Sequence, residues 1–450
     1  MKVDSFDNTL ICENNDLQTV LLYFKENRRM PEYIERAMLR VILEKITRAD
    51  IELETVDEYL SRLPLSFVQK TITDITILFS RNIEVSYKQN YLSYLLYYLP
   101  GNIFKVWKPL LDLQLKSSLK PQMRILDIGT GPGSVPIGII EYYKSLAESF
   151  LDITFSLSFV LIESEREFLN IAVKMINRIT NYLPQNLTIV VESTLCEKVG
   201  VENDFEDAIG KFDLITMSNF LTENEGENQL NGVSIINKFK SNTKNDGSLI
   251  IIEPGKKVSG MALKKIRNEV FQKRIFNIFS PCIGIWEEKT TYDCMCFNMV
   301  RCYWEVPRIY QYLISNGLSK AKRVDVPFNY LVLRKDNLKK YSIIKSSQHF
   351  TRLIDLKEKN GQNVNIIAII RTVIYNGERV SFSLCDGSCS FSEDSKAIWV
   401  NVSNEQLNQM GISIPLISAE KITLKKVSVK LNHERINLEI NNNSKITIDY

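Results

Sequence analysis

Residues 124–133 read Arg-Ile-Leu-Asp-Ile-Gly-Thr-Gly-Pro-Gly, and this stretch decides the fold. A short apolar strand that contains an acid leads into a glycine-rich turn, and a helix-forming stretch follows. Gly129, Gly131 and Gly133 lack a Cβ, so the backbone can turn tightly and come close to a ligand. The stretch therefore predicts a strand, turn and helix that together cradle a nucleotide-type cofactor.

The spacing of the glycines narrows the choice of cofactor. A dinucleotide fingerprint, G-x-G-x-x-G, needs a glycine at position 134, where this chain has Ser134. Here Asp127 precedes Gly129, Thr130, Gly131 and Gly133 in the pattern D-x-G-x-G-x-G. This pattern resembles the first motif of class I S-adenosylmethionine-dependent methyltransferases, in which the turn faces the methionine part of the cofactor.

A second predicted strand, 155–162, ends at Glu163 and is followed by a helical pattern over 165–179. In nucleotide-binding α/β folds an acid at this place accepts hydrogen bonds from a ribose diol, which makes Glu163 the candidate for that contact. Further strands are predicted at 187–191, 212–217 and 248–253, with room for helices between them. This alternation predicts a parallel sheet with helices on both faces.

In such a sheet the ligand lies beyond the carboxyl ends of the strands. This position adds Ser193 and Ser218 to the candidate cofactor-binding residues, with Glu192 and Asn219 beside them. The segment Met217-Ser218-Asn219-Phe220-Leu221 lacks the Asn/Asp-Pro-Pro-Tyr/Phe motif of many amino-group methyltransferases. No catalytic residue is therefore assigned.

Length and composition set the domain plan. A chain of 450 residues suggests about three domains. We expect a helical region over 1–105, the cofactor domain over 106–336 with a cysteine-rich insertion at 280–303, a lysine-rich linker over 337–350, and a β-domain over 351–450. No apolar run reaches the roughly 18 residues that cross a bilayer, and the acidic N-terminus lacks signal-peptide character, so we expect a cytoplasmic protein.

Positive charge gathers in one region although the whole chain carries only +3. Residues 256–345 hold 18 Lys and Arg against 7 Asp and Glu, a net charge of +11. Segregated positive charge attracts polyanions, of which nucleic acid is the commonest, although a solvated basic face without a partner is an alternative.

Four of the eight cysteines lie within this basic region, namely Cys282, Cys294, Cys296 and Cys302. Thiols clustered in a chain expected in the cytoplasm favour metal over disulfides, and chance clustering is the alternative. Their spacing fits neither a zinc ribbon nor the bacterial ferredoxin pattern, so it does not separate zinc from iron and sulfur.

The chain resembles the methyltransferase-like proteins of the small ribosomal subunit, first associated with mitochondrial ribosomes. The resemblance covers about residues 20–336 and rests on the glycine turn, the cysteine cluster and three further stretches: Arg29-Met30-Pro31-Glu32-Tyr33, Glu253-Pro254-Gly255 and Phe328-Asn329-Tyr330-Leu331-Val332-Leu333-Arg334-Lys335. It implies that the four cysteines hold an iron-sulfur cluster of the four-iron, four-sulfur type, with zinc as the alternative. It also implies action on small-subunit ribosomal RNA, or on the assembling subunit, as a methyltransferase or as a non-catalytic assembly factor.

The two ends of the chain differ in character. Helical periodicity at 17–24, 33–46 and 57–63 predicts an N-terminal helical region, whose aromatics Tyr91, Tyr94, Tyr97, Tyr98, Phe104 and Trp107 we interpret mainly as core. Five strand-like runs at 364–374, 379–384, 397–402, 422–431 and 436–440, with a helix at 404–410, predict a barrel of the oligonucleotide-binding (OB) type. Phe382 and Trp399 are candidates for stacking on bases, or for a buried aromatic core.

Overall fold

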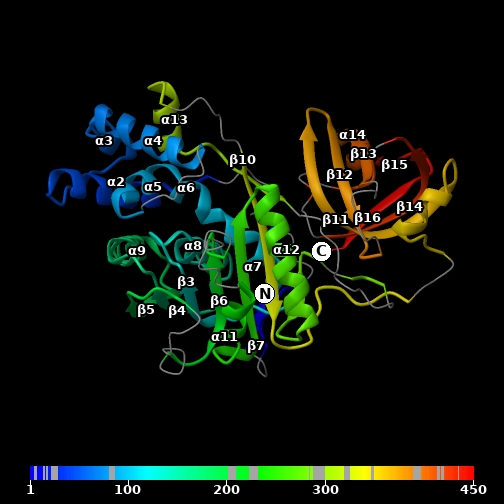
Figure 1. The fold of residues 1–450 in the computed structure, drawn as a ribbon, viewed down its shortest axis with the longest axis horizontal. Helices are drawn as coiled ribbons and strands as arrows, with labels where there is room; N and C mark the ends of the chain where they lie inside the picture. Colours follow the sequence, from blue (N-terminus) through cyan, green and yellow to red (C-terminus); the bar gives the residue numbers. More distant parts are fainter. Residues whose placement is uncertain are drawn as a thin grey trace. The chain divides into compact units, whose positions relative to one another are not determined.

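A computed structural model describes the chain apart from residues 5–7, 14–15, 17–18, 22–28, 81–86, 201–208, 222–231, 283, 287–298, 319–324, 346–348, 389–396, 413–415, 417–419, 434 and 450. The chain divides into two compact units, whose elements are labelled in Figure 1. The first unit comprises 1–223, 241–244 and 302–326, and the second comprises 224–240, 245–301 and 327–450.

A parallel sheet forms the centre of the first unit. Its strands lie in the order β5-β4-β3-β6, and all neighbouring pairs are parallel: β3 (Gln122–Ile128), β4 (Phe155–Ile162), β5 (Leu187–Leu195) and β6 (Phe212–Ser218). The last four residues of β4 and six of the seven residues of β6 are buried, as expected for strands covered on both faces. The parallel α/β sheet that the sequence predicts is confirmed.

The predicted end of β5 at Val191 was four residues too early. The strand continues to Leu195 because its pairing with β4 resumes after an irregularity near Val160 and keeps Leu195 opposite Ile162. Polar residues at 192–194 conceal this extension in the sequence, since they lie on the solvent-exposed edge of the sheet. A strand edge that faces water does not need apolar residues.

Helices follow β3 and β4 as predicted, as α8 (Ser134–Ser149) and α9 (Arg166–Ile179). The buried residues of α9 recur at helical spacing, and its partly buried Lys174 and Arg178 both pair with Glu44 of α2 (Glu32–Thr47), at 2.5 and 2.8 Å. Ion pairs thus join the two helices beside the apolar face of α9.

The rest of the first unit is largely helical. It contains α3 (Val56–Ser61), α4 (Leu65–Ser80), α5 (Tyr87–Tyr97), α6 (Leu99–Asn102), the 3₁₀ helix η1 (Ile103–Val106), α7 (Trp107–Gln114) and α13 (Arg308–Ser315). The predicted helix over 17–24 lies largely outside the described residues. Tyr97, Phe104 and Trp107 are buried, which confirms their interpretation as core.

The second unit contains a small antiparallel group of strands in the order β7-β10-β8: β7 (Thr243–Pro254), β10 (Asp325–Arg334) and β8 (Asn277–Ser280). Helices α11 (Gly232–Lys238) and α12 (Lys257–Gln272) flank β7 in the chain. Asn329 lies opposite Glu253, and its Nδ2 donates to the Pro254 carbonyl at 2.6 Å. The Glu-Pro-Gly turn is therefore held in place by β10.

The C-terminal part of the second unit is a closed barrel of five strands. Its order is β11-β12-β13-β15-β14, and β14 pairs back with β11: β11 (Asn363–Asn376), β12 (Arg379–Cys385), β13 (Ala397–Ser403), β14 (Lys421–Leu431) and β15 (Arg435–Glu439). Helix α14 (Asn404–Gln409) stands between the third and fourth strands. This arrangement confirms the predicted OB-like barrel.

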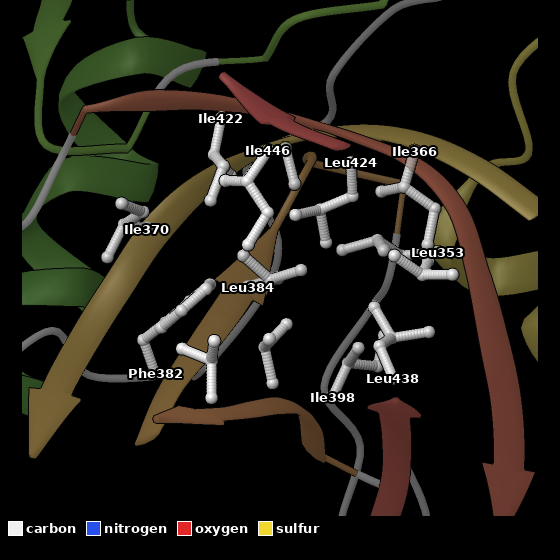
Figure 2. Packing of buried hydrophobic residues seen from close by; sticks show 14 of the residues in the cluster. Leu353, Ile366, Ile370, Phe382, Leu384, Ile398, Ile422, Leu424, Leu438 and Ile446 are labelled. Carbon is white, nitrogen blue, oxygen red and sulfur yellow. The ribbon is translucent and has the colours of Figure 1, made fainter. Parts of the chain in front are cut away.

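Alternating apolar residues fill the barrel. Figure 2 shows Phe382 and Leu384 of β12, Ile398 of β13 and Leu424 of β14 converging onto one core. Phe382 is fully buried on the inward side of β12, so of the two alternatives for this residue the structure selects the buried core and not stacking. Trp399 lies between the inward-facing Ile398 and Val400 and is partly exposed. The added strand β16 (Lys445–Asp449), which pairs with β14, was not predicted.

Part of the lysine-rich stretch expected as a linker is packed against the barrel. Lys340 and Glu420 are both fully buried and pair at 2.9 Å, and the Tyr341 hydroxyl donates to the other Glu420 oxygen at 2.5 Å. Trp286 packs in the same apolar cluster as Tyr341 and donates from Nε1 to Asp386 at 2.9 Å.

Among the described helices none is both long and apolar enough to cross a membrane.

Candidate functional site

The glycine-rich turn lies at the carboxyl end of β3, as the sequence predicts. Gly129, Gly131 and Gly133 have φ angles of +70°, +54° and +92°, which glycine adopts without steric cost. The amides of Gly129 and Thr130 both donate to the carbonyl of Ile162, the last residue of β4, at 2.9 and 3.0 Å. The turn is therefore anchored to the neighbouring strand before α8 begins.

Glu163 is joined directly to this turn. Its Oε2 accepts a hydrogen bond from the Gly131 amide at 2.8 Å, and its Oε1 accepts from the Ser164 hydroxyl and the Glu165 amide, each at 3.1 Å. Each carboxylate oxygen has about two lone-pair sites, so Oε2 keeps acceptor capacity for a ligand hydroxyl. The two residue sets that the sequence assigns to one cofactor thus lie in contact.

Asp127 is almost fully buried beneath the turn, with 1% of its surface exposed. Its Oδ1 accepts from the Thr216 hydroxyl of β6 at 2.5 Å, whereas Oδ2 is buried and finds no hydrogen-bond partner among the described residues. Burial raises the pKa of Asp127 to about 7, against the opposing effect of hydrogen bonds from Thr216 and Thr130. Thr216 was not identified from the sequence, because its role depends on the register that places it opposite Asp127.

Ser218 is the last residue of β6 and reaches the same edge of the sheet, since the register aligns Met217 with Ile128 immediately before the turn. Ser193 lies differently. It is exposed inside β5, opposite Val160 and two residues before the strand ends at Leu195. Its neighbour Glu192 pairs with Arg124 at 2.7 Å, which lowers the pKa of Glu192.

The residues after Ser218 lie against the glycine turn. A Cβ built on Gly129 would lie 2.7 Å from Cδ2 of Phe220, so the Phe220 ring covers one side of Gly129. A side chain at this position would force the Phe220 ring or the turn to shift. Asn219, between Ser218 and Phe220, has a φ of +51°, and its buried side-chain oxygen finds no hydrogen-bond partner in the part of the chain that the structure describes.

The glycine turn and Glu163 together form a candidate site for S-adenosylmethionine. A turn of three left-handed glycines permits close approach of a ligand, and an acid at the end of the next strand provides acceptors for a diol. The residues present fit a nucleoside-containing cofactor at this edge.

The predicted metal site is described only in part. Cys282 lies beside Lys264, whose Nζ contacts its Sγ, and Cys302 is buried. Cys294 and Cys296 lie outside the described residues. Among the residues that are described, no group of three or more His, Cys, Asp or Glu side chains gathers as a metal-binding cluster.

Only some of the basic side chains in residues 256–345 are exposed at the surface. Lys264, Arg267, Arg334 and Lys340 are buried. Others are exposed, including Lys256, Lys257, Lys265, Lys273, Arg274, Lys339 and Lys345. The charge available to a polyanion is therefore smaller than the sequence count suggests.

Parts of this chain resemble solved structures. No protein-family model and no curated protein matches it. Solved structures that resemble parts of it include the StiE O-methyltransferase, at 12% identity and a TM-score of 0.25, covering 48% of this chain and 69% of that one. The OB domain of MM0293 from Methanosarcina mazei has 20% identity and a TM-score of 0.18, covering 23% and 85%.

A murine DNA-binding protein bound to double-stranded DNA has 19% identity and a TM-score of 0.18. The match covers 22% of this chain and spans about half, 47%, of the murine protein. TM-scores this low carry no argument. The fold class of this chain, an α/β unit with a parallel sheet and a closed five-stranded barrel, rests on its own strand order.

Proposed function

We propose that the chain is an S-adenosylmethionine-dependent methyltransferase that acts on RNA of the small ribosomal subunit, free or in the assembling subunit. The observation that carries the cofactor assignment is the Gly131–Glu163 hydrogen bond, which joins the glycine turn to the acid of the neighbouring strand. Both lie at the carboxyl ends of parallel strands, where α/β sheets bind ligands.

In this proposal each residue set has its own task. When bound, S-adenosylmethionine supplies a methyl group made electrophilic by the sulfonium. Gly129, Thr130, Gly131 and Gly133 admit the cofactor close to the backbone, and Glu163 accepts from the ribose diol. Asp127 and Thr216 support the turn from below, and Ser193 and Ser218 are the remaining candidate contacts.

The RNA substrate is inferred from charge and from the barrel. Exposed lysines and Arg274 of the +11 region offer phosphate contacts, and OB-like barrels commonly bind single strands. Partly exposed Trp399 remains available for stacking on a base. The choice of ribosomal RNA rests on the family resemblance in the sequence.

Calorimetric titration with S-adenosylmethionine and with NAD tests the cofactor assignment. We expect S-adenosylmethionine to bind and NAD not to bind, because position 134 is not glycine. Binding of NAD alone would overturn the assignment. RNA binding that weakens steeply with salt is expected in parallel, because phosphate contacts release counterions.

One observation favours a second function, that of a non-catalytic assembly factor. The Phe220 ring lies against Gly129, on the turn that would receive the cofactor. If this contact closes the site, the fold serves as an RNA-binding scaffold. Phe220→Ala would then increase cofactor affinity, whereas an enzyme already able to bind would gain little.

We further propose that Cys282, Cys294, Cys296 and Cys302 hold an iron-sulfur cluster of the four-iron, four-sulfur type, with zinc as the alternative. Four thiolates suit either group. Anaerobic purification followed by metal analysis distinguishes them. Broad visible absorption that bleaches on reduction indicates iron and sulfur, and a colourless protein with bound zinc indicates the alternative.

A further inference from the structure

We infer that the outer wall of the barrel carries a phosphate-binding site, formed by Lys425, Lys426 and Lys445, which holds the backbone of an RNA strand. That the strand is RNA rests on the proposed function, whereas the site itself lies outside the basic region 256–345. Its centre is a β-bulge in β14 that turns two consecutive lysines toward solvent.

The bulge follows from the pairing of β14 with β11. The register between these strands shifts at Asn365 of β11, so Lys425 and Lys426 together lie opposite this one residue. Successive side chains of a regular strand point to opposite faces, yet both lysines are exposed. A bulge re-aims side chains in this way, and without it one of the two lysines would point into the apolar core.

The backbone at the bulge is held in an unusual conformation. Lys426 has a φ of +54°, which residues other than glycine and asparagine seldom adopt. Its amide donates to Asn365 Oδ1 at 2.9 Å. Its carbonyl accepts from Asn441 Nδ2 at 3.2 Å and from the Ser444 hydroxyl at 2.8 Å. Strained residues that their neighbours hold so firmly concentrate at ligand-binding sites, so the lysine side chain calls for a role.

A third lysine joins the bulge from β16. Leu424 of β14 pairs with Ile446, and Figure 2 shows both in the core of the barrel. The next pair in the register is Lys425 opposite Lys445, and both side chains are exposed on the outer wall. Directly opposed side chains lie close together, and like charges at such positions repel. An anion bound between the ammonium groups would remove this repulsion.

The charge of these lysines is not neutralised locally. Within the part of the chain that the structure describes, none of the three forms an ion pair. The acids of the neighbouring strands pair with other lysines: Asp449 with Lys421 at 2.8 Å, and Glu439 with Lys430 at 3.1 Å. The outer wall therefore has a positive patch, although residues 351–450 together hold 12 basic and 11 acidic residues.

The chemistry of the patch suits a phosphate backbone. A lysine ammonium has three donors and no acceptor, and it binds phosphate oxygens as a point charge. An RNA strand presents a phosphate at every nucleotide, so neighbouring lysines can engage neighbouring phosphates. A membrane surface fits less well, because no large hydrophobic side chain is exposed on the described residues of β14, β15 and β16.

The patch lies on a different wall from the face with which OB-type barrels commonly bind oligonucleotides. That face belongs to the second and third strands, here β12 and β13, and β13 carries Trp399. In the strand order β11 separates β14 from β12, and β15 separates β14 from β13. The lysine patch is thus a second contact surface, which binds through charge and does not read bases.

Fluorescence anisotropy with labelled oligouridylate and oligoadenylate, without S-adenosylmethionine, tests the site. The double variant Lys425→Gln, Lys445→Gln should bind both strands roughly 10-fold more weakly than the wild type at physiological salt. The slope of log affinity against log salt should fall in magnitude by about 1.4, since each phosphate contact of a single strand contributes about 0.7. Wild-type affinity and slope in this variant would overturn the inference.

A control variant removes the same charge elsewhere. Lys70→Gln, Lys357→Gln changes exposed lysines on α4 and on the 3₁₀ helix η3 (Leu353–Glu358) and should bind as the wild type does. Equal losses in the two double variants would show that only the net charge matters, which would also overturn the site.

Two further variants separate binding from folding. Lys445→Glu places an opposite charge beside Lys425, so the midpoint of thermal unfolding should rise slightly while RNA binding weakens. Lys426→Gly accommodates the positive φ, so it should fold and lose about 0.7 of the salt slope. Unchanged RNA binding in both variants would contradict the site.

This site and the proposed function fail in distinguishable ways. If the wild type methylates RNA while the Lys425→Gln, Lys445→Gln variant binds RNA normally, only the site is refuted. If no methyl is transferred but this variant loses RNA affinity, the enzyme is refuted and the site stands. A wild-type protein that binds phosphatidylserine vesicles but neither oligonucleotide would overturn the inference.

Discussion

The backbone amide of Gly131 donates a hydrogen bond to Oε2 of Glu163 at 2.8 Å, across two neighbouring parallel strands. The two residues are 32 positions apart in the chain, yet sequence patterns assign both to one ligand. Their contact makes the shape of the glycine turn depend on the acid. Predictions about cofactor binding therefore begin with Glu163.

Replacing Glu163 by alanine should weaken S-adenosylmethionine binding by roughly 10- to 100-fold, because a charge-assisted contact to the ligand and the tie to Gly131 are lost together. Glu163→Gln keeps one acceptor oxygen and should lose less. Calorimetric dissociation constants provide the measurement, with exposed Glu197→Gln as the control. Unchanged affinity in Glu163→Ala would contradict the assignment of this acid.

Alanine should be tolerated differently at two glycines of the turn. Both Gly129 and Gly131 have positive φ, which costs an alanine about 1 kcal/mol. At Gly129 the new Cβ would also lie 2.7 Å from Phe220, whereas at Gly131 it meets nothing within 4 Å.

Gly129→Ala should thus lower the midpoint of thermal unfolding more than Gly131→Ala. Phe220→Ala in the same chain should remove most of the difference by removing the clash. Equal effects of the two alanines would show that Phe220 does not lie against Gly129 in solution.

Asp127 should make stability depend on pH. Burial raises its pKa from 3.8 to about 7, so between these values the folded state keeps a proton that the unfolded state has lost. The free energy of unfolding should therefore fall as pH rises through this window and level off above about 7. Asp127→Asn should flatten this decline, measured by urea unfolding near both ends of the window.

Part of the decline should remain in Asp127→Asn, because burial also raises the pKa of Glu35 and Glu141 to about 7. If the pH dependence of unfolding in Asp127→Asn equals that of the wild type, the Asp127 carboxyl is exposed to water and not buried.

The buried Lys340–Glu420 pair should make a large contribution to stability when one partner is removed. Lys340→Met leaves an uncompensated carboxylate beside Tyr341 and should cost about 3–5 kcal/mol of unfolding free energy. Adding Glu420→Gln removes the charge and keeps an acceptor for Tyr341, so the double variant should recover much of the loss. Urea unfolding of the full chain measures both, and equal stability of Lys340→Met and wild type would contradict burial of the pair.

Much of the fold was predictable because local patterns agree with tertiary structure. Strand 155–162 was predicted to the residue, since its apolar run is bounded by polar residues. The barrel strands could be predicted because apolar and polar residues alternate along them and because Asn-Gly or Asp-Gly turns separate them. The prediction missed β16 because it is short, with a mixed burial pattern.

Site residues could be predicted where a single segment of the sequence shows the pattern. They could not be predicted where the pairing of two strands brings distant residues together. Glycine spacing and a strand-end acid identify the turn and Glu163 from their own segments. Thr216 and Phe220 act through contacts with residues about ninety positions away, which only the β3–β6 register brings together. Burial of Phe382 likewise follows from the side of β12 on which it lies.

Transfer of labelled methyl from S-adenosylmethionine to purified small-subunit ribosomal RNA, by the wild type and by Gly129→Arg, tests the central claim most directly. The account predicts label in RNA with the wild type and none with the variant, whose arginine would enter the space held by Phe220 and the cofactor. RNA binding by the variant should be unchanged, which controls for its folding. No label from a wild-type protein that measurably binds both S-adenosylmethionine and RNA would contradict the enzyme and leave the assembly factor.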